Sequence, residues 1–418
     1  MNYTQAVDFI HSRQRFSSTP GLDRIKRITS LCGNPQRSMR FIHIAGTNGK
    51  GSTSVMISNI LTAAGYRTGL STSPYITDFR ERFRIDGELI SEEELTAITE
   101  QLYPVITKLD SEGVVANEFE VVIAITLLWF AQKGCDYAVL EVGLGGRYDA
   151  TNVIDAPECA VITHIDLDHT AILGDTVEQI ATEKCGIIKK GCKAVAYPHQ
   201  YQEANKVIAD TCKALDCPFV IPQIPDYKAD LSGAEFEYKG ACYSLRLVGD
   251  HQVLNAVTAI EAALSIGIDP KHIAQGIAAA TMPARVEVVS KAPLIILDGA
   301  HNPDGMRALS KVLDRFDGQK PVAIMGMLKD KDCTAAVSEV APKFSQIITV
   351  AVDNPRTMTA AELKACLSPY CDRVTAADSI DAALTLADEI KGENPLVICG
   401  SLYLASQIRP KLPQKQNN

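Results

Sequence analysis

A glycine-rich turn that ends in a lysine and a serine is the first part of this chain whose residue types could do chemistry. It lies within the segment HIAGTNGKGS. Gly46, Gly49 and Gly51 would let backbone N–H groups approach an anion with no Cβ in the way. Lys50 would add a positive charge, and Ser52 a hydroxyl for a metal on the phosphates. Gly51 separates Lys50 from Ser52, unlike in the standard phosphate loop, yet the combination favours a nucleoside triphosphate site over a plain turn.

Two elements must position this turn. The apolar run at residues 41–45 predicts a strand before it, and residues 53–64 predict a helix after it. The turn would then lie at the positive end of the helix dipole, which is the context that a phosphate-binding loop needs.

Polar side chains follow two further predicted strands. Glu141 ends one strand and opens the loop VGLGGRYDATN, and His169 follows the next strand in the segment DLDHT. In open parallel sheets, ligands bind beyond the carboxyl ends of the strands, and a carboxylate there is suited to Mg²⁺. The alternatives are a solvated glutamate in a glycine-rich turn and an ordinary turn histidine.

Four other residues have weaker signals. Lys184 lies in a helical pattern, where periodicity alone predicts a solvated surface charge. Asp298 and His301 follow a predicted strand and would face the carboxyl edge of a second sheet. Arg285 precedes that strand in a linker, from which it could reach a ligand in a cleft between domains; a surface arginine is the alternative.

The whole chain sets limits on the class of protein. Its 418 residues predict two domains. A net charge of −9 argues against a nucleic-acid surface, and the longest apolar stretch, residues 121–131, is too short to span a bilayer. The N-terminal residues lack the apolar segment of a signal peptide, and the twelve cysteines show no zinc spacing. We therefore expect a cytoplasmic protein with reduced thiols and no membrane partner.

Strand-like and helical patterns alternate along the chain, which predicts an α/β fold with mostly parallel sheets. Strands are expected at 41–45, 137–142, 159–164, 194–197, 294–297, 322–325, 347–350 and 396–399. Two alternating runs around Lys239-Gly240 predict a hairpin. We expect a P-loop-type domain with a mostly parallel sheet over residues 1–282, followed by a smaller Rossmann-like α/β domain over residues 283–418.

On these motifs the chain resembles the folylpolyglutamate synthase/dihydrofolate synthase family, within the Mur ligase superfamily. The resemblance runs nearly end to end. It rests on residues 45–52, 72–74, 141–152, 167–170, 183–187, 251–252, Asn255, Arg285 and 297–303. Together and in order these segments are specific to the family, whereas the phosphate loop alone would indicate only the superfamily.

The resemblance implies roles residue by residue. The ATP-binding residues would be Thr47, Asn48, Gly49, Lys50, Gly51, Ser52, Asn255, Arg285 and Asp298. The Mg²⁺ ligands would be Ser73, Glu141, His169 and Lys184, the last as a carbamate formed with CO₂. The pterin substrate would contact Phe119, Glu120, Tyr148, Asp149 and Ala150. The catalytic residues would be Lys50, Lys184 and His301.

Two departures from the family pattern bear on these roles. Cys185 stands where the family commonly has alanine, and this small residue leaves the role of Lys184 intact. Asn117 and Glu118 replace a threonine-aromatic pair typical of bifunctional members, so the use of dihydropteroate stays open.

The resemblance implies an ATP-dependent ligase, acting as a monomer on small molecules, that adds L-glutamate to the carboxylate of a folate. Three alternatives stay open at this point: a P-loop kinase or NTPase, a nucleotide-sensing module without turnover, and another Mur-type amino-acid ligase. A kinase would share the phosphate loop, but it would need no amino-acid acceptor.

Overall fold

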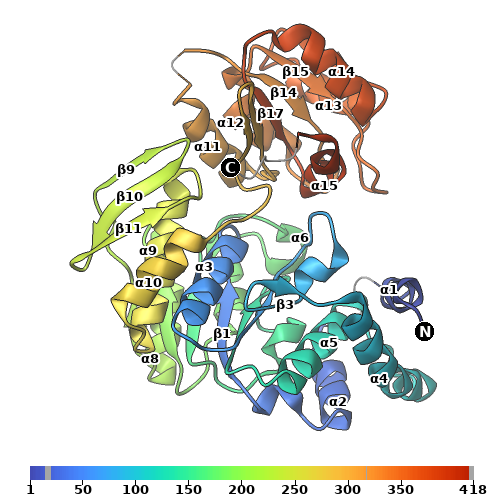
Figure 1. The fold of residues 1–418 in the computed structure, drawn as a ribbon, viewed down its shortest axis with the longest axis vertical. Coiled ribbons are helices and arrows are strands. Elements are labelled where there is room, and N and C mark those ends of the chain that lie inside the picture. Colours follow the sequence, from blue (N-terminus) through green and yellow to red (C-terminus); the bar gives the residue numbers. More distant parts are fainter. Residues whose placement is uncertain (15–19, 317, 414–418) are drawn as a thin grey trace. The chain divides into compact units, whose positions relative to one another are not determined.

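The computed structural model describes residues 1–14, 20–316 and 318–413, which form two compact units (Figure 1). The first unit comprises Met1–Pro225, Tyr238–Tyr243 and Leu254–Ala280, and the second comprises Asp226–Glu237, Ser244–Val253 and Thr281–Asn418. The domain boundary that the sequence predicts after residue 282 stays a prediction.

The first unit is built on an eight-stranded sheet with the order β4-β3-β2-β5-β1-β6-β7-β8. Its strands are β1 (Arg40–Ala45), β2 (Thr68–Ser71), β3 (Arg84–Ile85), β4 (Glu88–Leu89), β5 (Tyr137–Glu141), β6 (Cys159–Ile162), β7 (Lys193–Ala196) and β8 (Phe219–Val220). The six strands from β2 to β8 in this order pair in parallel, and β3 and β4 add an antiparallel edge. Strand β1 is therefore central, between β5 and β6.

Within the described residues, ten helices accompany this sheet along the sequence. They are α1 (Tyr3–His11), α2 (Asp23–Leu31), α3 (Lys50–Ala63), α4 (Glu92–Ser111), α5 (Glu118–Gln132), α6 (Thr170–Leu173), α7 (Val177–Cys185), α8 (Gln202–Leu215), α9 (Asp250–Ser265) and α10 (Pro270–Ala279). Helix α3 packs on β1, β2 and β5, and α10 packs on α3. Their approach is close, because a Cβ on Gly276 would come within 2.4 Å of the Ile60 backbone.

The local sequence explains two of these helices. Helix α4 begins after a capping box in which Ser91 and Glu94 each bond to the other's backbone N–H. Helix α5 contains the whole of the longest apolar stretch and is buried from Glu120 to Phe130, so this stretch forms a core helix. Among the described residues, no helix combines the length and the apolar composition that crossing a membrane requires.

A separate three-stranded antiparallel sheet contains β9 (Tyr227–Asp230), β10 (Gly233–Tyr238) and β11 (Ala241–Leu245), in the order β11-β10-β9. The turn between β10 and β11 has positive φ at both Lys239 (49°) and Gly240 (78°). This geometry is that of a tight hairpin turn, and it confirms the hairpin predicted there.

The second unit is built on a six-stranded sheet with the order β12-β13-β17-β14-β15-β16. Its strands are β12 (Glu287–Lys291), β13 (Leu294–Leu297), β14 (Val322–Met325), β15 (Gln346–Thr349), β16 (Val374–Ala376) and β17 (Leu396–Cys399). Its helices are α11 (Pro303–Leu313), α12 (Cys333–Val340), α13 (Ala360–Leu367), α14 (Ile380–Lys391) and α15 (Leu402–Ile408). Only β12 pairs antiparallel, so the unit is a mostly parallel α/β sheet.

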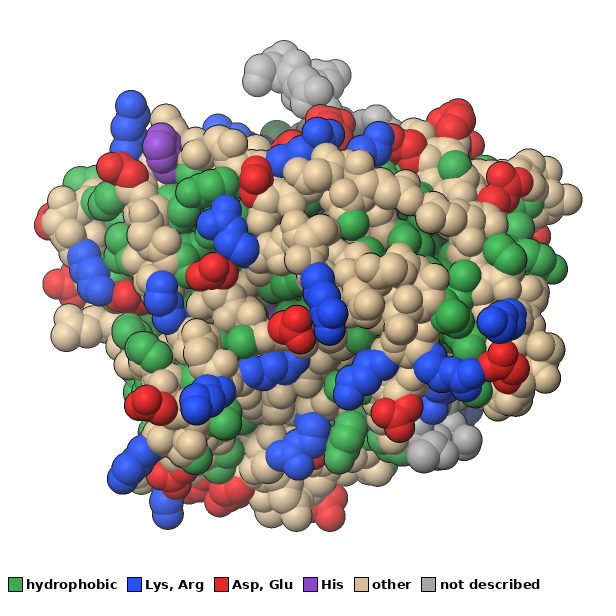
Figure 2. Space-filling view, turned by 90° about the horizontal axis from the view of Figure 1, so that it is seen from below, with side chains coloured by type: hydrophobic (Ala, Val, Ile, Leu, Met, Phe, Trp, Pro, Cys, Tyr) green, Lys and Arg blue, Asp and Glu red, His purple; other side chains and the backbone are tan. Residues whose placement is uncertain are grey.

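All twelve cysteines are free thiols, and seven of them are buried. On the face drawn in Figure 2, lysine and arginine side chains are interspersed with aspartate and glutamate. The α/β fold class predicted from the sequence is confirmed. The short strands β2, β3, β4, β8, β9, β12 and β16 were not predicted.

Candidate active site

The glycine-rich turn connects the end of β1 to the start of α3. The backbone N–H groups of Thr47 and Asn48 donate to the carbonyl of His164, at 2.7 and 3.2 Å, which ties the turn to the end of β6. A Cβ on Gly46 would lie 1.8 Å from Thr163 Oγ1, so only glycine fits there. Gly49 has a φ of 88°, and a Cβ on it would lie 2.3 Å from Asn255 Oδ1. The turn is therefore a closely fitted cradle at the N-terminus of α3.

Lys50 is the first residue of α3 and folds back over the turn. Its Nζ donates to the carbonyl oxygens of Gly46 and Thr47, both at 3.0 Å. The positive charge of this ammonium lies over the turn, so an anion bound against the cradle would contact it. Ser52 is buried on the same helix, and Asn255 on α9 lies against Gly49. The structure thus brings Lys50 and Asn255 to the same turn.

Glu141 and Ser73 lie together at the carboxyl end of the sheet. Glu141 is the last residue of β5, is buried, and accepts a hydrogen bond from the backbone N–H of Ser73 at 2.9 Å. Ser73 follows β2, which is the neighbour of β5. His169 follows β6 and adopts a φ of 53° before the short helix α6, with its Nε2 3.9 Å from Asp168 Oδ1. Three of the four predicted metal ligands, Ser73, Glu141 and His169, therefore lie at or beyond the carboxyl ends of parallel strands of one sheet, whereas Lys184 lies on α7.

Lys184 is not the solvated surface lysine that its helical pattern predicts. It is 4% exposed, and its Nζ donates to the carbonyl of Gly46 at 2.8 Å. Burial, and then the nearby Lys50 ammonium, lower the pKa of Lys184 to about 7. The pattern failed because α7 is buried on the side that faces the phosphate loop, and that contact spans 138 positions in the chain.

Residues 143–152 form a loop that is organised by the buried carboxylate of Asp149. Its Oδ2 accepts from Leu144 N at 2.9 Å, and its Oδ1 accepts from Thr151 N at 3.0 Å and from Thr151 Oγ1 at 2.5 Å. Burial raises the pKa of the Asp149 carboxyl, and these hydrogen bonds oppose the rise. The ring of Phe119 closes over Gly143, where a Cβ would lie 2.8 Å from its Cζ.

The other predicted substrate residues differ in their surroundings. Tyr148 is 52% exposed, whereas Ala150 is buried in a short 3-10 turn, Ala150–Val153. Glu120 is buried and has both carboxylate oxygens near Arg24 Nε, at 3.0 and 3.1 Å. It also accepts from Asn117 N at 2.9 Å, which caps α5. Glu120 is thus held within its own unit by Arg24 and by its helix start, and its substrate role stays a prediction.

In the second unit, Asp298 and Arg285 are held close to one another by a linker of unusual conformation. Ala284 and Val286, on either side of Arg285, both have positive φ, 53° and 46°. Such values are rare for a β-branched residue and indicate strain of about 1–3 kcal/mol. Asp298 Oδ2 accepts from Val286 N at 2.7 Å, and a Cβ on Gly299 would lie 2.8 Å from Arg285 Nη1.

His301 lies at the end of the same loop. Its Nδ1 is 2.8 Å from the carbonyl of Gly299, and Asn302 caps the start of α11 with its side chain on Gly305 N. Asp304 is in the first turn of α11.

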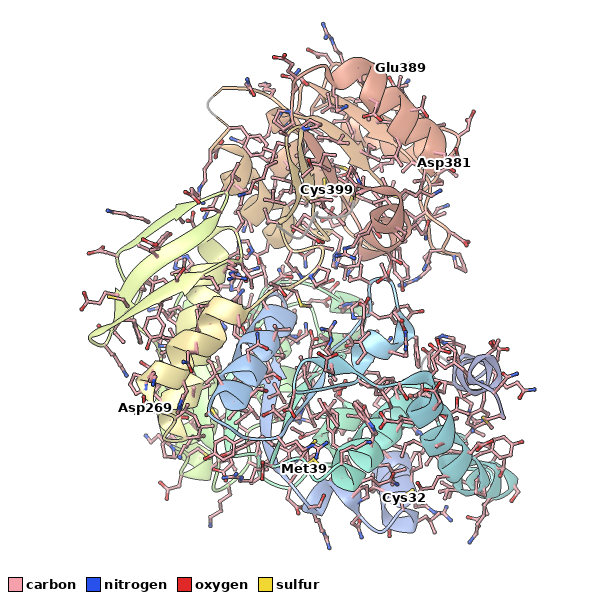
Figure 3. All side chains as sticks on the ribbon, viewed as in Figure 1. Cys32, Met39, Asp269, Asp381, Glu389 and Cys399 are labelled. Atoms are coloured by element: carbon pink, nitrogen blue, oxygen red, sulfur yellow. The ribbon has the colours of Figure 1, made fainter. Side chains whose placement is uncertain are left out.

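A cavity of about 440 Å³ lies elsewhere, at the opposite edge of the first sheet. It is lined by Arg40 and Phe41 at the start of β1, by Met39, which Figure 3 labels, and by Glu158 next to the start of β6. Since none of the predicted site residues lines it, the cavity is separate from the candidate active site.

Comparison with known proteins matches the chain to two domain families and to several relatives. Residues 44–263 match the Mur ligase middle domain, and residues 284–402 match the Mur ligase, glutamate ligase domain. The chain is 38% identical over 434 residues to the folylpolyglutamate synthase of Lacticaseibacillus casei, covering 99% of each chain. It is 37% identical to the dihydrofolate synthase/folylpolyglutamate synthase of Bacillus subtilis, covering 98% of this chain and 99% of that protein.

Solved structures are similar over the same length. The folylpolyglutamate synthase of Mycobacterium tuberculosis in complex with ADP has a TM-score of 0.91 at 31% identity, with 99% of each chain covered. A folylpolyglutamate synthase bound to AMPPCP and folate has a TM-score of 0.87 at 34% identity, covering 98% of this chain and 99% of that one. Together with the two domain matches, these relatives show that the chain is an ATP-dependent ligase.

The chain belongs to the folylpolyglutamate synthase/dihydrofolate synthase family of Mur ligases. The family that the sequence motifs predicted is therefore confirmed. The roles of the individual site residues stay predictions.

Proposed function

We propose that this chain joins L-glutamate to the carboxylate of a folate in a reaction that consumes ATP. The relatives named above support the substrates, and the position of Lys184 is the observation that supports the site most specifically. A kinase or a simple NTPase would need the cradle and Lys50, but it would not need a second, buried lysine that donates to the carbonyl of Gly46.

The cradle fits the phosphates of ATP. The Gly46 and Gly49 positions admit no Cβ, and the free N-terminus of α3 attracts an anion. When ATP binds, Lys50 Nζ would exchange its hydrogen bonds to the carbonyls of Gly46 and Thr47 for contacts with the phosphates. We propose that Thr47, Asn48, Gly51 and Ser52 complete the phosphate contacts and that Asn255, Arg285 and Asp298 also contact ATP, each as the family resemblance implies.

The residues at the sheet edge fit Mg²⁺, which prefers oxygen ligands. We propose that Ser73, Glu141 and His169 hold it, together with a carbamate on Lys184. Bound there, Mg²⁺ would offset the negative charge of the phosphates. The carbamate forms when the neutral amine of Lys184 attacks CO₂ and loses a proton. Burial favours the neutral amine, and the adjacent Lys50 ammonium favours the anion that results.

The carbamate can be tested apart from turnover. Protein equilibrated with ¹³C-bicarbonate should show one slowly exchanging carbamate signal by ¹³C NMR, and Lys184→Arg should abolish it. An unchanged signal in Lys184→Arg, or no signal in the wild type with Mg²⁺ and ATP analogue present, would contradict the assignment.

The proposed reaction has two steps. An oxygen of the folate carboxylate attacks the γ-phosphorus of ATP, which releases ADP and leaves an acyl phosphate. The amine of glutamate then attacks the acyl carbon, the tetrahedral intermediate collapses, and inorganic phosphate and a proton leave. Lys50 would hold the transferring phosphoryl group, and the loop at residues 143–152 with Phe119 would hold the donor.

A four-way assay tests this function. ADP release is measured with tetrahydrofolate or with dihydropteroate, each with and without L-glutamate. We expect release with tetrahydrofolate to depend on glutamate. Release that is independent of glutamate would support the kinase alternative and contradict the proposal. The dihydropteroate arms decide whether this chain shares the second activity named for the Bacillus subtilis relative.

A further inference from the structure

His43 is an unusual residue for the central strand of a sheet. Its neighbours along β1, Phe41, Ile42, Ile44 and Ala45, are apolar and buried, and His43 itself is 0% exposed. Its Nδ1 has no hydrogen-bond partner among the residues that the structure describes. An unpaired buried nitrogen costs stability, so an aliphatic residue would serve the core better. The other ring nitrogen, Nε2, is 2.8 Å from Thr151 Oγ1.

The direction of this contact follows from the next one. Thr151 Oγ1 lies 2.5 Å from Asp149 Oδ1, and both oxygens of Asp149 also accept backbone N–H groups. A carboxylate can only accept, so the Thr151 hydroxyl donates to Asp149 and must itself accept from His43. This fixes the His43 tautomer with its proton on Nε2. Burial, and then the Lys189 ammonium, lower the pKa of His43 to about 3, which keeps the ring neutral.

The three side chains connect two parts of the candidate active site. His43 lies on β1 three residues before Gly46 of the phosphate cradle, and Asp149 organises the loop at residues 143–152. The other side of that loop is tied to α7, which carries Lys184. Arg147 N donates to Glu183 O at 2.9 Å, and Asn152 Nδ2 donates to Gly186 O at 3.1 Å.

We propose that His43 and Thr151 are positioning residues that set the affinity for the pteridine donor, by holding Asp149 in place relative to the phosphate cradle. This inference rests on the proposed function in one respect, because it takes the loop at residues 143–152 to be the donor site. Neither residue touches the substrates. Each acts through Asp149, whose orientation depends on the Thr151 hydroxyl.

Matched substitutions separate this role from simple packing. Thr151→Val keeps the side-chain shape and removes the hydroxyl, whereas Thr151→Ser keeps the hydroxyl. We expect Thr151→Val to raise the KM for tetrahydrofolate about tenfold, the effect of one charge-assisted hydrogen bond, with the KM for ATP unchanged. Thr151→Ser should recover most of the affinity. Thr99→Val is the control, since this buried hydroxyl donates to the Leu95 carbonyl in its own helix.

The histidine is tested in the same way. His43→Gln places an amide N–H near the position of Nε2 and should behave like Thr151→Ser, whereas His43→Leu should behave like Thr151→Val. If either single variant fails to fold, the double variant His43→Leu/Thr151→Val removes both polar groups together and should show the same loss of donor affinity. Equal effects on both KM values, or donor KM values unchanged in folded variants, would overturn the inference.

A second measurement is independent of turnover. The Leu144 amide donates to Asp149 Oδ2, so hydrogen exchange in the peptide that contains it should quicken in Thr151→Val and not in Thr151→Ser or Thr99→Val. If the wild-type protein showed no glutamate-dependent activity, the proposed function would be refuted. The exchange pattern would still show whether Thr151 positions Asp149, because it does not depend on turnover. Unchanged exchange in Thr151→Val would overturn the positioning role.

Discussion

At the scale of single residues, Lys50 carries the most direct prediction. Lys50→Ala should abolish glutamate-dependent ADP release, because Lys50 begins α3 and would bring its positive charge directly to the transferring phosphoryl group in the proposed site. The fold should be retained, since Lys50 Nζ donates to carbonyls of its own turn, those of Gly46 and Thr47. The assay is ADP release, with circular dichroism as the fold check. Lys213→Ala, an exposed lysine on α8, is the control. Normal turnover by folded Lys50→Ala would contradict the cradle assignment.

His43 gives a prediction about stability and pH. Its pKa falls from 6.5 to about 3 on folding, so below pH 6.5 the unfolded chain binds a proton that the folded chain does not. Stability from this group is complete above pH 6.5 and is lost as the pH falls. The expected loss is about 1.4 kcal/mol between about pH 7.5 and pH 5.5.

Urea unfolding at the two pH values measures this loss of stability. The titratable groups near His43 are Lys189, which acts through its charge, and the buried Asp149, which is linked to His43 through Thr151. The pH-dependent loss should be smaller by that amount in His43→Gln and unchanged in His199→Gln, which replaces an exposed histidine. An identical loss in wild type and His43→Gln would mean that His43 is protonated in the folded protein.

The individual residues also show where sequence reasoning reaches its limit. The phosphate cradle was predictable, because its residues are adjacent in the sequence and their types alone indicate an anion site. The burial of Lys184 was not, because it depends on a contact with Gly46 across 138 positions. The partnership of His43 with Thr151 spans 108 positions and was missed for the same reason. A histidine within an otherwise apolar strand was the one signal that could have pointed to it.

At the scale of elements, the turn into α3 depends on the conformation of Gly49. Gly49→Ala should lower kcat/KM for ATP by more than tenfold, because alanine is strained at a φ of 88° and its Cβ would displace Asn255. Strain of this kind costs about 1–3 kcal/mol. Steady-state kinetics with ATP varied measures the effect.

Gly113→Ala is the matched control for this change. Gly113 has a φ of 78°, but nothing lies within 4 Å of a Cβ built on it. It should therefore lose stability without losing activity. Equal losses of kcat/KM in the two variants would show that the effect is global strain and not the fit of the cradle.

Elements with strong local patterns were predicted well. The strands at 294–297, 322–325 and 396–399 were placed at the residues where the structure has β13, β14 and β17. The missed strands are two to five residues long, and β3, β4 and β12 pair antiparallel at sheet edges. So short a segment has too few residues to show periodicity, and its pairing is decided by the neighbouring strand.

At the scale of the whole molecule, Arg285 lies in the linker that leads to the sheet of the second unit. If it contacts ATP as proposed, Arg285→Ala should raise the KM for ATP and lower kcat, by about tenfold in kcat/KM or more. Arg285→Lys should recover only part, since an ammonium cannot replace the planar guanidinium. Kinetics with ATP and glutamate each varied decides this. Wild-type constants for Arg285→Ala would make it a structural residue of the linker.

The most direct test of the account follows the oxygen atoms of the donor. Tetrahydrofolate labelled with ¹⁸O in its glutamate γ-carboxylate is incubated with ATP, Mg²⁺, L-glutamate and the intact chain, and the products are analysed by mass spectrometry. We predict three products: a folate longer by one glutamyl unit, ADP, and inorganic phosphate that carries one ¹⁸O from the donor. Unlabelled phosphate, or a folate without the added glutamyl unit, would contradict ligation through an acyl phosphate.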